Sequence, residues 1–268
     1  MGRRTARRLV TRVRGAEVDR RPDTLAVEEP LEIRVDGEPF TVTMRTPGED
    51  VELAHGLLRS EGVIRTREDV RTARFCSDTG ELNVLDIALT VAGGPALSSQ
   101  RTLAAYGGCG LCGSSTIDAV TDRLGGTPVP VATSVTPTAV HRALDGLREA
   151  QSVFERTGGT HGAALAGAAG EVVHVREDVG RHNAVDKVLG AVIIDGAESP
   201  PPLLVVSSRA SFEIVAKAAM SGVEVLACVS AASSLAVDAA EQLGLTLVAF
   251  ARGDRLTVCS HPERIDDI

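Results

Sequence analysis

The sequence holds 268 residues, of which 43% are hydrophobic and only 2% aromatic, with no Trp and a single Tyr. This length supports a sizeable buried core, which must be built from aliphatic side chains. The net charge of −8 argues against a general nucleic-acid binder, and no apolar run reaches the roughly 18–20 residues that span a bilayer.

The first 21 residues are the basic part of the chain. They carry eight Arg against Glu17 and Asp19, which leaves a net charge near −14 on the remainder. No apolar stretch follows these arginines, so we expect no secretory signal and a solvated, flexible arm over residues 1–25. The expected compartment is the reducing cytosol, where a Cys-x-x-Cys pair is more often reactive or metal-binding than a structural disulfide.

Residues 26–130 are predicted to form an N-terminal part with strong strand character. Its alternating and helical patterns are separated by glycine-rich segments. The expected elements, in chain order, are a β-hairpin over 30–46 with its turn at Asp36–Gly37, a helix within 46–64, a strand over 82–91, and a helix from Ser114 or Ser115 to Gly125–Gly126.

Strands and helices alternate through residues 131–268, the predicted C-terminal domain. The expected elements are a helix from Thr136–Pro137 to Gly158, a hairpin over 162–175, helices over 183–193, 211–222 and 233–244, and strands over 202–208, 223–230 and 245–250. Near-continuous apolar strands separated by helices are typical of a mostly parallel sheet covered by helices. We therefore expect an α/β fold in which this domain is joined to a smaller, β-rich N-terminal subdomain.

Two cysteines lie in the glycine-rich stretch AAYGGCGLCGSS, residues 104–115. Cys109 and Cys112 precede a predicted helix, whose first backbone N–H groups stabilise a thiolate. The glycines let a bulky partner approach and let the loop move. A reactive thiolate is favoured over half of a zinc site, because the other three cysteines are isolated in the sequence. A thioredoxin-type switch is less favoured, because the pair does not follow a strand in a βαβ unit.

Residues 157–190 hold a dense cluster of charged and imidazole side chains. Arg181 and Lys187 are candidates for gripping phosphates, because the loop that contains Arg181 leads into a helix N-terminus. His161 or His182 is a candidate for moving protons or for hydrogen bonding to a persulfide. The alternative is a solvated loop whose polar residues only cap the following helix.

Further candidates follow the predicted strands at their carboxyl ends, where open parallel sheets collect ligands. Arg209 and Lys217 are candidate phosphate partners after one of these strands. The last strand leads into FARGDR, residues 250–255, in which Phe250 offers a flat face for a base and two arginines flank a glycine. The alternative for this segment is an ordinary turn.

Together, these segments closely resemble the FdhD family, the sulfur carrier proteins that formate dehydrogenase activity requires. The likeness rests on the block from EEPLEIRVDG to SEGVI, on CGLC, on THGAAL with VREDVGRHNAVDKVLG, and on the block from SSRASFEIVAKAAM to FARGDRLTV. It extends from about residue 28 to the end of the chain, with the blocks in the same order.

The resemblance implies a cytoplasmic accessory protein that takes sulfur from a cysteine desulfurase. It would pass the sulfur to the molybdenum cofactor, Mo-bis(molybdopterin guanine dinucleotide), before insertion into formate dehydrogenase. Cys109 matches the persulfide position, with Cys112 as the second thiol. A layered fold similar to cytidine deaminases and a homodimer are also implied, without a permanently bound metal. The cofactor-binding stretch maps onto Phe250, Ala251, Arg252, Gly253, Asp254 and Arg255. Relatives often have Pro or Gly at the position of Asp254, which leaves its role open.

Two rival functions are weighed against sulfur transfer. A zinc deaminase needs a His-x-Glu motif followed downstream by Pro-Cys-x-x-Cys. Here the His-x-Glu motif is His261–Glu263, which comes after the cysteines, and no proline precedes Cys109, so the order disfavours this enzyme. The other rival is a zinc-clamped chaperone that binds the cofactor without carrying sulfur, which a zinc determination on the purified protein would test.

Overall fold

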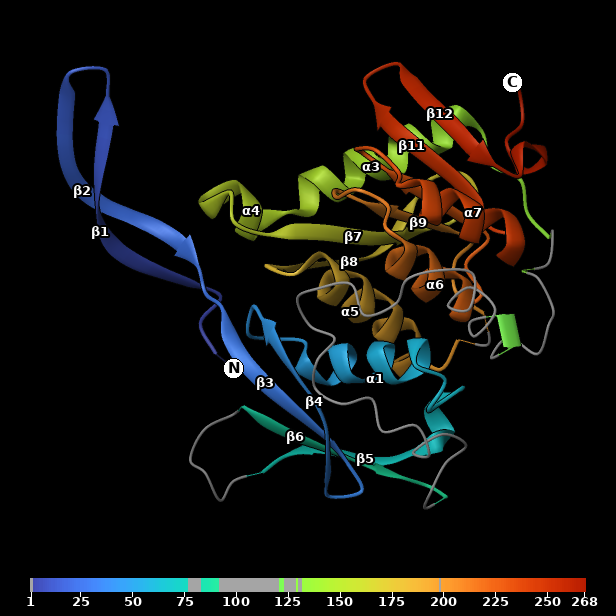
Figure 1. Cartoon of the computed structure of the whole chain (residues 1–268), viewed down its shortest axis with the longest axis horizontal. Coiled ribbons are helices and arrows are strands. Elements are labelled where there is room, and N and C mark those ends of the chain that lie inside the picture. Colours follow the sequence, from blue (N-terminus) through green and yellow to red (C-terminus); the bar gives the residue numbers. More distant parts are fainter. Residues whose placement is uncertain (1, 77–82, 92–120, 123–128, 130–131, 198) are drawn as a thin grey trace.

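The computed structural model describes residues 2–76, 83–91, 121–122, 129, 132–197 and 199–268. They form two sheet-based units and a projecting N-terminal hairpin (Figure 1). The predicted cysteine loop, with Cys109 and Cys112, lies outside the described residues. No helix in the described part of the chain combines the length and apolar character that a membrane crossing needs.

The N-terminal residues form an antiparallel hairpin of β1 (Thr5–Arg14) and β2 (Glu17–Ala26), which differs from the flexible arm expected from sequence. Its two-residue turn begins with Gly15 at a φ of 61°, a conformation that glycine adopts readily. An ion pair between Arg12 and Asp23, 2.8 Å long, joins the two strands. The sequence prediction missed this hairpin because the many arginines drew attention away from an alternation of side chains that is typical of a two-stranded ribbon.

The smaller unit is a four-stranded sheet with the order β4-β3-β6-β5. Its elements are β3 (Glu29–Val35), β4 (Glu38–Arg45), α1 (Asp50–Ser60), the 3₁₀ helix η1 (Arg67–Asp69), β5 (Val70–Phe75) and β6 (Val84–Leu89). The hairpin of β3 and β4, the helix α1 and the strand β6 confirm the prediction. The polar strand β5 was not predicted, because its sequence VRTARF lacks a run of apolar residues. Leu31, Ile33 and Leu85 pack with Leu53 and Leu58 of α1 in a separate core.

The larger unit is a six-stranded sheet with the order β12-β11-β10-β9-β7-β8. Its strands are β7 (His161–Ala166), β8 (Val172–Asp178), β9 (Leu203–Val206), β10 (Val225–Cys228), β11 (Thr246–Arg252) and β12 (Arg255–Ser260). The α/β class is confirmed, but only β9, β10 and β11 run parallel. The sheet is mixed because the β7–β8 hairpin and the returning strand β12 pair antiparallel with their neighbours.

Helices cover both faces of this larger sheet (Figure 1). They are α3 (Pro137–Ala150), α4 (Ser152–Thr157), α5 (Arg181–Ile194), α6 (Phe212–Met220) and α7 (Ser234–Leu243), followed by the 3₁₀ helix η3 (Pro262–Arg264). α3 packs on one face, whereas α5, α6 and α7 share a core on the other. The helix expected up to Gly158 is divided at Gln151, whose φ and ψ of −74° and 68° are not helical.

The two units meet where α1 crosses α5 at a pair of glycines. A Cβ atom placed on Gly56 would lie 1.9 Å from the carbonyl oxygen of Asp186, and one on Gly190 would lie 1.9 Å from that of Glu52. Real Cβ atoms do not approach backbone oxygen so closely. The two helix backbones can therefore touch only because neither residue has a side chain.

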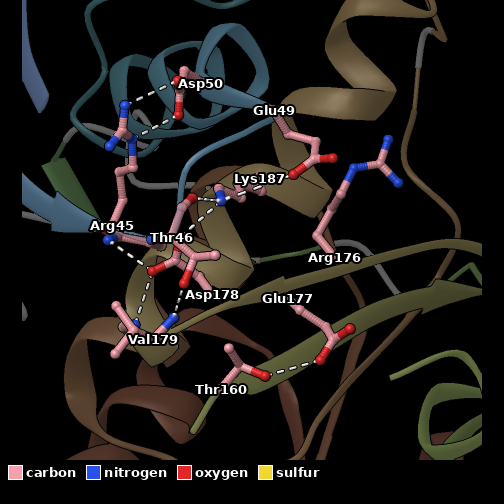
Figure 2. A network of polar contacts seen from close by, with 12 residues as sticks. Arg45, Thr46, Glu49, Asp50, Thr160, Arg176, Glu177, Asp178, Val179 and Lys187 are labelled. Carbon is pink, nitrogen blue, oxygen red and sulfur yellow. Dashed lines mark hydrogen bonds and ion pairs between the residues drawn. The ribbon is translucent and has the colours of Figure 1, made fainter. Parts of the chain in front are cut away.

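A buried ion pair lies beside this crossing and joins the two units (Figure 2). The ammonium of Lys187 is fully enclosed, 2.7 Å from the carboxylate of Asp178, and it donates a 2.8 Å hydrogen bond to the carbonyl of Thr46. The N–H of Thr46 donates to Asp178 at 3.0 Å, and its hydroxyl accepts from the N–H of Val179 at 3.1 Å. Thr46 directly follows β4 of the smaller unit. Its N–H, carbonyl and hydroxyl groups all bind residues of the larger unit, so Thr46 links the two.

The glycine crossing yields the first prediction. We expect Gly56→Ala to lower the free energy of unfolding by about 1–3 kcal/mol, because overpacking outweighs the helix propensity that alanine gains. Urea denaturation followed by circular dichroism measures the change. Gly146→Ala in α3 is the comparison variant, because its Cβ would meet a methyl group of the Val172 side chain at 2.7 Å rather than a backbone oxygen at 1.9 Å. Equal stability of Gly56→Ala and wild type would contradict the close crossing.

The ion pair yields the second prediction. We expect Lys187→Met to lower the free energy of unfolding by about 3–5 kcal/mol, because the Asp178 carboxylate stays buried without its ammonium. Adding Asp178→Asn should recover part of the loss. Arg12→Met removes an exposed ion pair and should cost less than about 1 kcal/mol. Chemical denaturation tests the set, and a cost for Lys187→Met as small as that for Arg12→Met would rule out the proposed link.

Candidate functional site

The carboxyl ends of the parallel strands form one continuous edge with the start of β7. Hydrogen bonds between successive loops hold this edge together: Ser207 N–H to the Gly162 carbonyl (3.0 Å), Gly162 N–H to the Ser207 hydroxyl (2.9 Å), Ala210 N–H to the Ala231 carbonyl (3.1 Å) and Phe250 N–H to the Ser230 carbonyl (3.0 Å). The structure therefore gathers the segments that hold His161, Arg209 and Phe250 along one edge, a position that the sequence predicted for Arg209 and Phe250 but not for His161.

The N-terminus of α5 adds Arg181 and His182 to this edge. The helix begins after Gly180 without a side-chain cap. His182 Nε2 lies 2.8 Å from a carboxylate oxygen of Glu213 in α6, and this contact lowers the pKa of Glu213. Burial lowers the pKa of His161, and the nearby charges of Arg181 and His182 lower it further. His161 is therefore neutral at pH 7 and is able to accept a proton or a hydrogen bond.

The loop before α5 is fixed by polar contacts to the smaller unit. The carboxylate of Asp178 accepts hydrogen bonds from the N–H of Gly180 at 2.8 Å and from the amide of Asn183 at 3.2 Å. The same Asn183 amide donates to the carbonyl of Met44 at 2.7 Å, and its oxygen accepts from the hydroxyl of Thr43 at 3.1 Å. Sequence reasoning missed these positioning roles, because the partners lie more than 130 residues apart.

The two lysines occupy settings other than those expected. Lys187 is enclosed by Asp178 and the Thr46 carbonyl, and burial lowers its pKa. The ammonium of Lys217 lies 2.8 Å from both carboxylate oxygens of Asp186, a buried residue of α5. Both ammonium groups therefore bind carboxylates within the fold. This corrects the expectation that Lys187 contacts phosphate, because a fully enclosed ammonium is out of reach of a ligand.

The turn between β11 and β12 contains the predicted cofactor-binding segment. Phe250 has a φ of 52°, a left-handed conformation that is strained for a bulky residue, and the residue is 40% exposed. A bulge between Ala249 and Arg252 accompanies it. The guanidinium carbon of Arg255 lies 5.9 Å from the centre of the Phe250 ring. Arg252, Gly253, Asp254 and Arg255 are exposed, whereas Ala251 is buried. The segment is thus a distorted turn that presents an aromatic ring and two arginines.

A cavity of about 500 Å³ opens between the end of α3 and this edge of the sheet. Leu147, Phe154, His161 and Ser207 contribute to a mainly apolar wall. Gln151 also lines it and is 3% exposed, and its Nε2 has no hydrogen-bond partner within the described part of the chain. A mainly apolar cavity with a few polar groups is typical of small-molecule sites.

Cys228 and Cys259 are poor candidates for a reactive thiolate. Burial raises the pKa of Cys228 to about 11, and its thiol donates to the carbonyl of Ser230 at 3.0 Å. Burial also raises the pKa of Cys259. Among the described residues, no three His, Cys, Asp or Glu side chains are grouped as metal ligands, and His261 pairs with Glu263 at 3.0 Å. The assignment of Cys109 and Cys112 stays a prediction.

The fold is shared with a solved structure. A putative formate dehydrogenase accessory protein from Desulfotalea psychrophila superposes with a TM-score of 0.77, over 97% of this chain and 99% of that chain. The sequence identity is 22%, so this likeness describes the fold alone.

Relatives of higher identity extend over almost the whole chain. The sulfur carrier protein FdhD of Mycobacterium tuberculosis is 48% identical over 279 residues, covering 99% of this chain and 100% of the relative. The protein of the same name from Streptomyces coelicolor is 48% identical over 278 residues, covering 99% and 97%. The family described as FdhD/NarQ matches residues 26–266. By this match and these identities, the chain belongs to the FdhD/NarQ family.

Proposed function

We propose that this protein is a sulfur carrier in formate dehydrogenase maturation. It takes persulfide sulfur from a cysteine desulfurase onto Cys109 and passes it to Mo-bis(molybdopterin guanine dinucleotide). The observation that carries the proposal is the strained turn of Phe250–Arg255, which presents an aromatic ring and arginines at the carboxyl edge of the sheet. The relatives named sulfur carrier protein FdhD support the same role.

The chemistry of the cofactor suits this edge. Its guanines have flat faces on which Phe250 can stack, and its pyrophosphates are ligands for guanidinium groups. Arg252 and Arg255 come from the turn, Arg181 is the first residue of α5, and Arg209 comes from a neighbouring loop. These side chains provide local positive charge on a chain whose net charge is −8. The cofactor is therefore expected to lie across the ends of β9, β10 and β11.

The two thiols of the Cys-x-x-Cys motif supply a balanced route for the sulfur. The Cys112 thiolate attacks the inner sulfur of the Cys109 persulfide, and a Cys109–Cys112 disulfide forms. The bond to the outer sulfur breaks, and that sulfur leaves as HS⁻ with the electron pair, ready for the cofactor. The dithiol is the source of the two electrons, and a thiol reductant restores it. His161, whose pKa burial lowers, is the proposed acceptor of the proton that the Cys112 thiol loses when its thiolate forms.

The proposed role of Cys109 gives the third prediction. After incubation with a cysteine desulfurase and cysteine, mass spectrometry without reductant should find an added 32 Da on the peptide that contains Cys109. Cys109→Ala should abolish this adduct and formate dehydrogenase maturation while leaving the protein folded. Cys259→Ala is the matched control and should retain both, because that thiol lies on β12 with a raised pKa. Normal maturation by Cys109→Ala would refute the assignment.

The turn gives the fourth prediction. Arg252→Ala combined with Arg255→Ala should raise the dissociation constant for GDP at least about tenfold, because charge-assisted hydrogen bonds contribute about 1.5–3 kcal/mol each. Isothermal titration calorimetry measures the affinity, and circular dichroism checks the fold. Arg71→Ala, an exposed arginine of β5, is the control and should leave the affinity unchanged. Unchanged GDP affinity in the double variant would remove the turn from the cofactor site.

A further inference from the structure

The cavity between α3 and the carboxyl edge of the larger sheet differs in chemistry from the turn that carries the arginines. Leu144, Leu147 and Val229 contribute to its mainly apolar wall. Among the described residues that line the cavity, none is Asp or Glu, and the exposed Arg148 is the only one with a permanent charge. A charge enclosed by apolar side chains is costly unless it is paired. The part of a ligand that enters this cavity is therefore uncharged.

Polar contacts behind the cavity fix the segments around it. The carboxylate of Glu177 accepts hydrogen bonds from the N–H groups of Val153 and Phe154, at 2.8 and 2.7 Å. It also accepts one from the hydroxyl of Thr160 at 2.9 Å (Figure 2). Phe154 and Thr160 both line the cavity, so α4 and the start of β7 are held together there. A ligand that enters does not have to order these segments, which favours binding.

Gln151 is the lining residue whose state points to a ligand. It is 3% exposed, and its Nε2 is enclosed without an acceptor in the described part of the chain. A Cβ atom on Gly162 would lie 2.7 Å from this nitrogen, so glycine makes the room for the amide. An enclosed N–H group without an acceptor destabilises a fold. Rotation of the amide about its last side-chain bond, which is weakly restricted, brings the NH₂ group to the cavity. There, an acceptor on a ligand would satisfy it.

Ser207 provides a second donor on the cavity wall. Its hydroxyl oxygen accepts a hydrogen bond from the N–H of Gly162 at 2.9 Å. The O–H of Ser207 has no acceptor of its own among the described residues, so its proton is available to a ligand. Together, the amide of Gln151 and this hydroxyl favour a ligand whose edge carries acceptors.

The cavity adjoins the Phe250–Arg255 turn. Val229 lines the cavity, and the next residue, Ser230, accepts a hydrogen bond from the N–H of Phe250 at 3.0 Å. One large ligand is therefore able to reach both places. Its anionic groups would stay with the exposed arginines, while an uncharged ring system enters the apolar cavity.

We propose that this cavity binds the pterin ring system of the molybdenum cofactor, and that Gln151 donates a hydrogen bond to an acceptor on the ring edge. The inference rests on the proposed function and names the part of the cofactor that enters the cavity. Pterin and guanine share a 2-amino-4-oxopyrimidine unit, whose oxo group and ring nitrogens are such acceptors. The pterin of molybdopterin is the larger, tricyclic system, and a cavity of about 500 Å³ has the size of a small-molecule site. Guanine then lies at the turn.

Fluorescence anisotropy of 6-hydroxymethylpterin, titrated with the full chain, tests the proposal. The wild type should bind this probe with a dissociation constant of about 1 mM or tighter. Gln151→Met keeps the length of the side chain and should raise that constant at least about fivefold, because the ring acceptor is then buried without a donor. Val229→Phe, which narrows the cavity, should also weaken binding.

Stability measurements separate this role from a purely structural one. The urea midpoint of Gln151→Met should equal or exceed that of the wild type, because the variant removes an enclosed group that lacks a partner. Gln242→Met is the matched control, since Gln242 is an exposed residue of α7, and it should leave the pterin affinity unchanged.

A second titration with GDP distinguishes the two ring systems. Gln151→Met should alter the dissociation constant for GDP less than about twofold. If the variant weakens GDP binding instead, the cavity holds guanine and the proposal is overturned. It is also overturned if the wild type does not bind the pterin, or if Gln151→Met binds it as tightly. A wild type that binds the pterin but forms no Cys109 adduct would refute sulfur transfer and leave the cavity assignment in place.

Discussion

The buried contact between Lys187 and Asp178 is the interaction on which the rest of the structure depends. It joins α5 and the end of β8, which are consecutive in the larger unit, to the Thr46 segment that follows the smaller sheet. A buried ammonium is tolerated because a carboxylate and a carbonyl replace its water. The same carboxylate binds the backbone before α5, so the contact that unites the two sheets also places Arg181 and His182 at the edge.

The candidate site thus consists of exposed side chains on elements that an enclosed polar network holds in place. Asn183 and Asp178 act on the backbone, whereas Arg209 and the Phe250–Arg255 turn face outward. The separation explains how a chain of net charge −8 has a locally basic edge. The strained φ of Phe250 lies among the outward-facing groups, where backbone strain commonly accompanies binding.

Sequence patterns predicted local structure well where apolar residues alternate regularly with polar ones or form an unbroken run. The alternation around Asp36–Gly37 and the apolar strands after residue 200 were interpreted correctly. The surroundings of the lysines were harder to predict, because a sequence gives no sign of whether a lysine is buried against a carboxylate, as Lys187 is against Asp178. The N-terminal hairpin was missed because its arginines outweighed the alternation, and the mixed sheet because β12 returns antiparallel after a strand exit expected to be a loop.

The glycine crossing of α1 and α5 has a consequence for how a ligand would bind to the molecule. With Gly56 and Gly190 in backbone contact, the interface contains no long side chains there whose rotamers could yield to a sliding movement. The two sheets consequently behave as one stiff block. A ligand that contacts both units would meet binding residues that are already in their final relative positions. Its association would therefore not require the two units to reorient first.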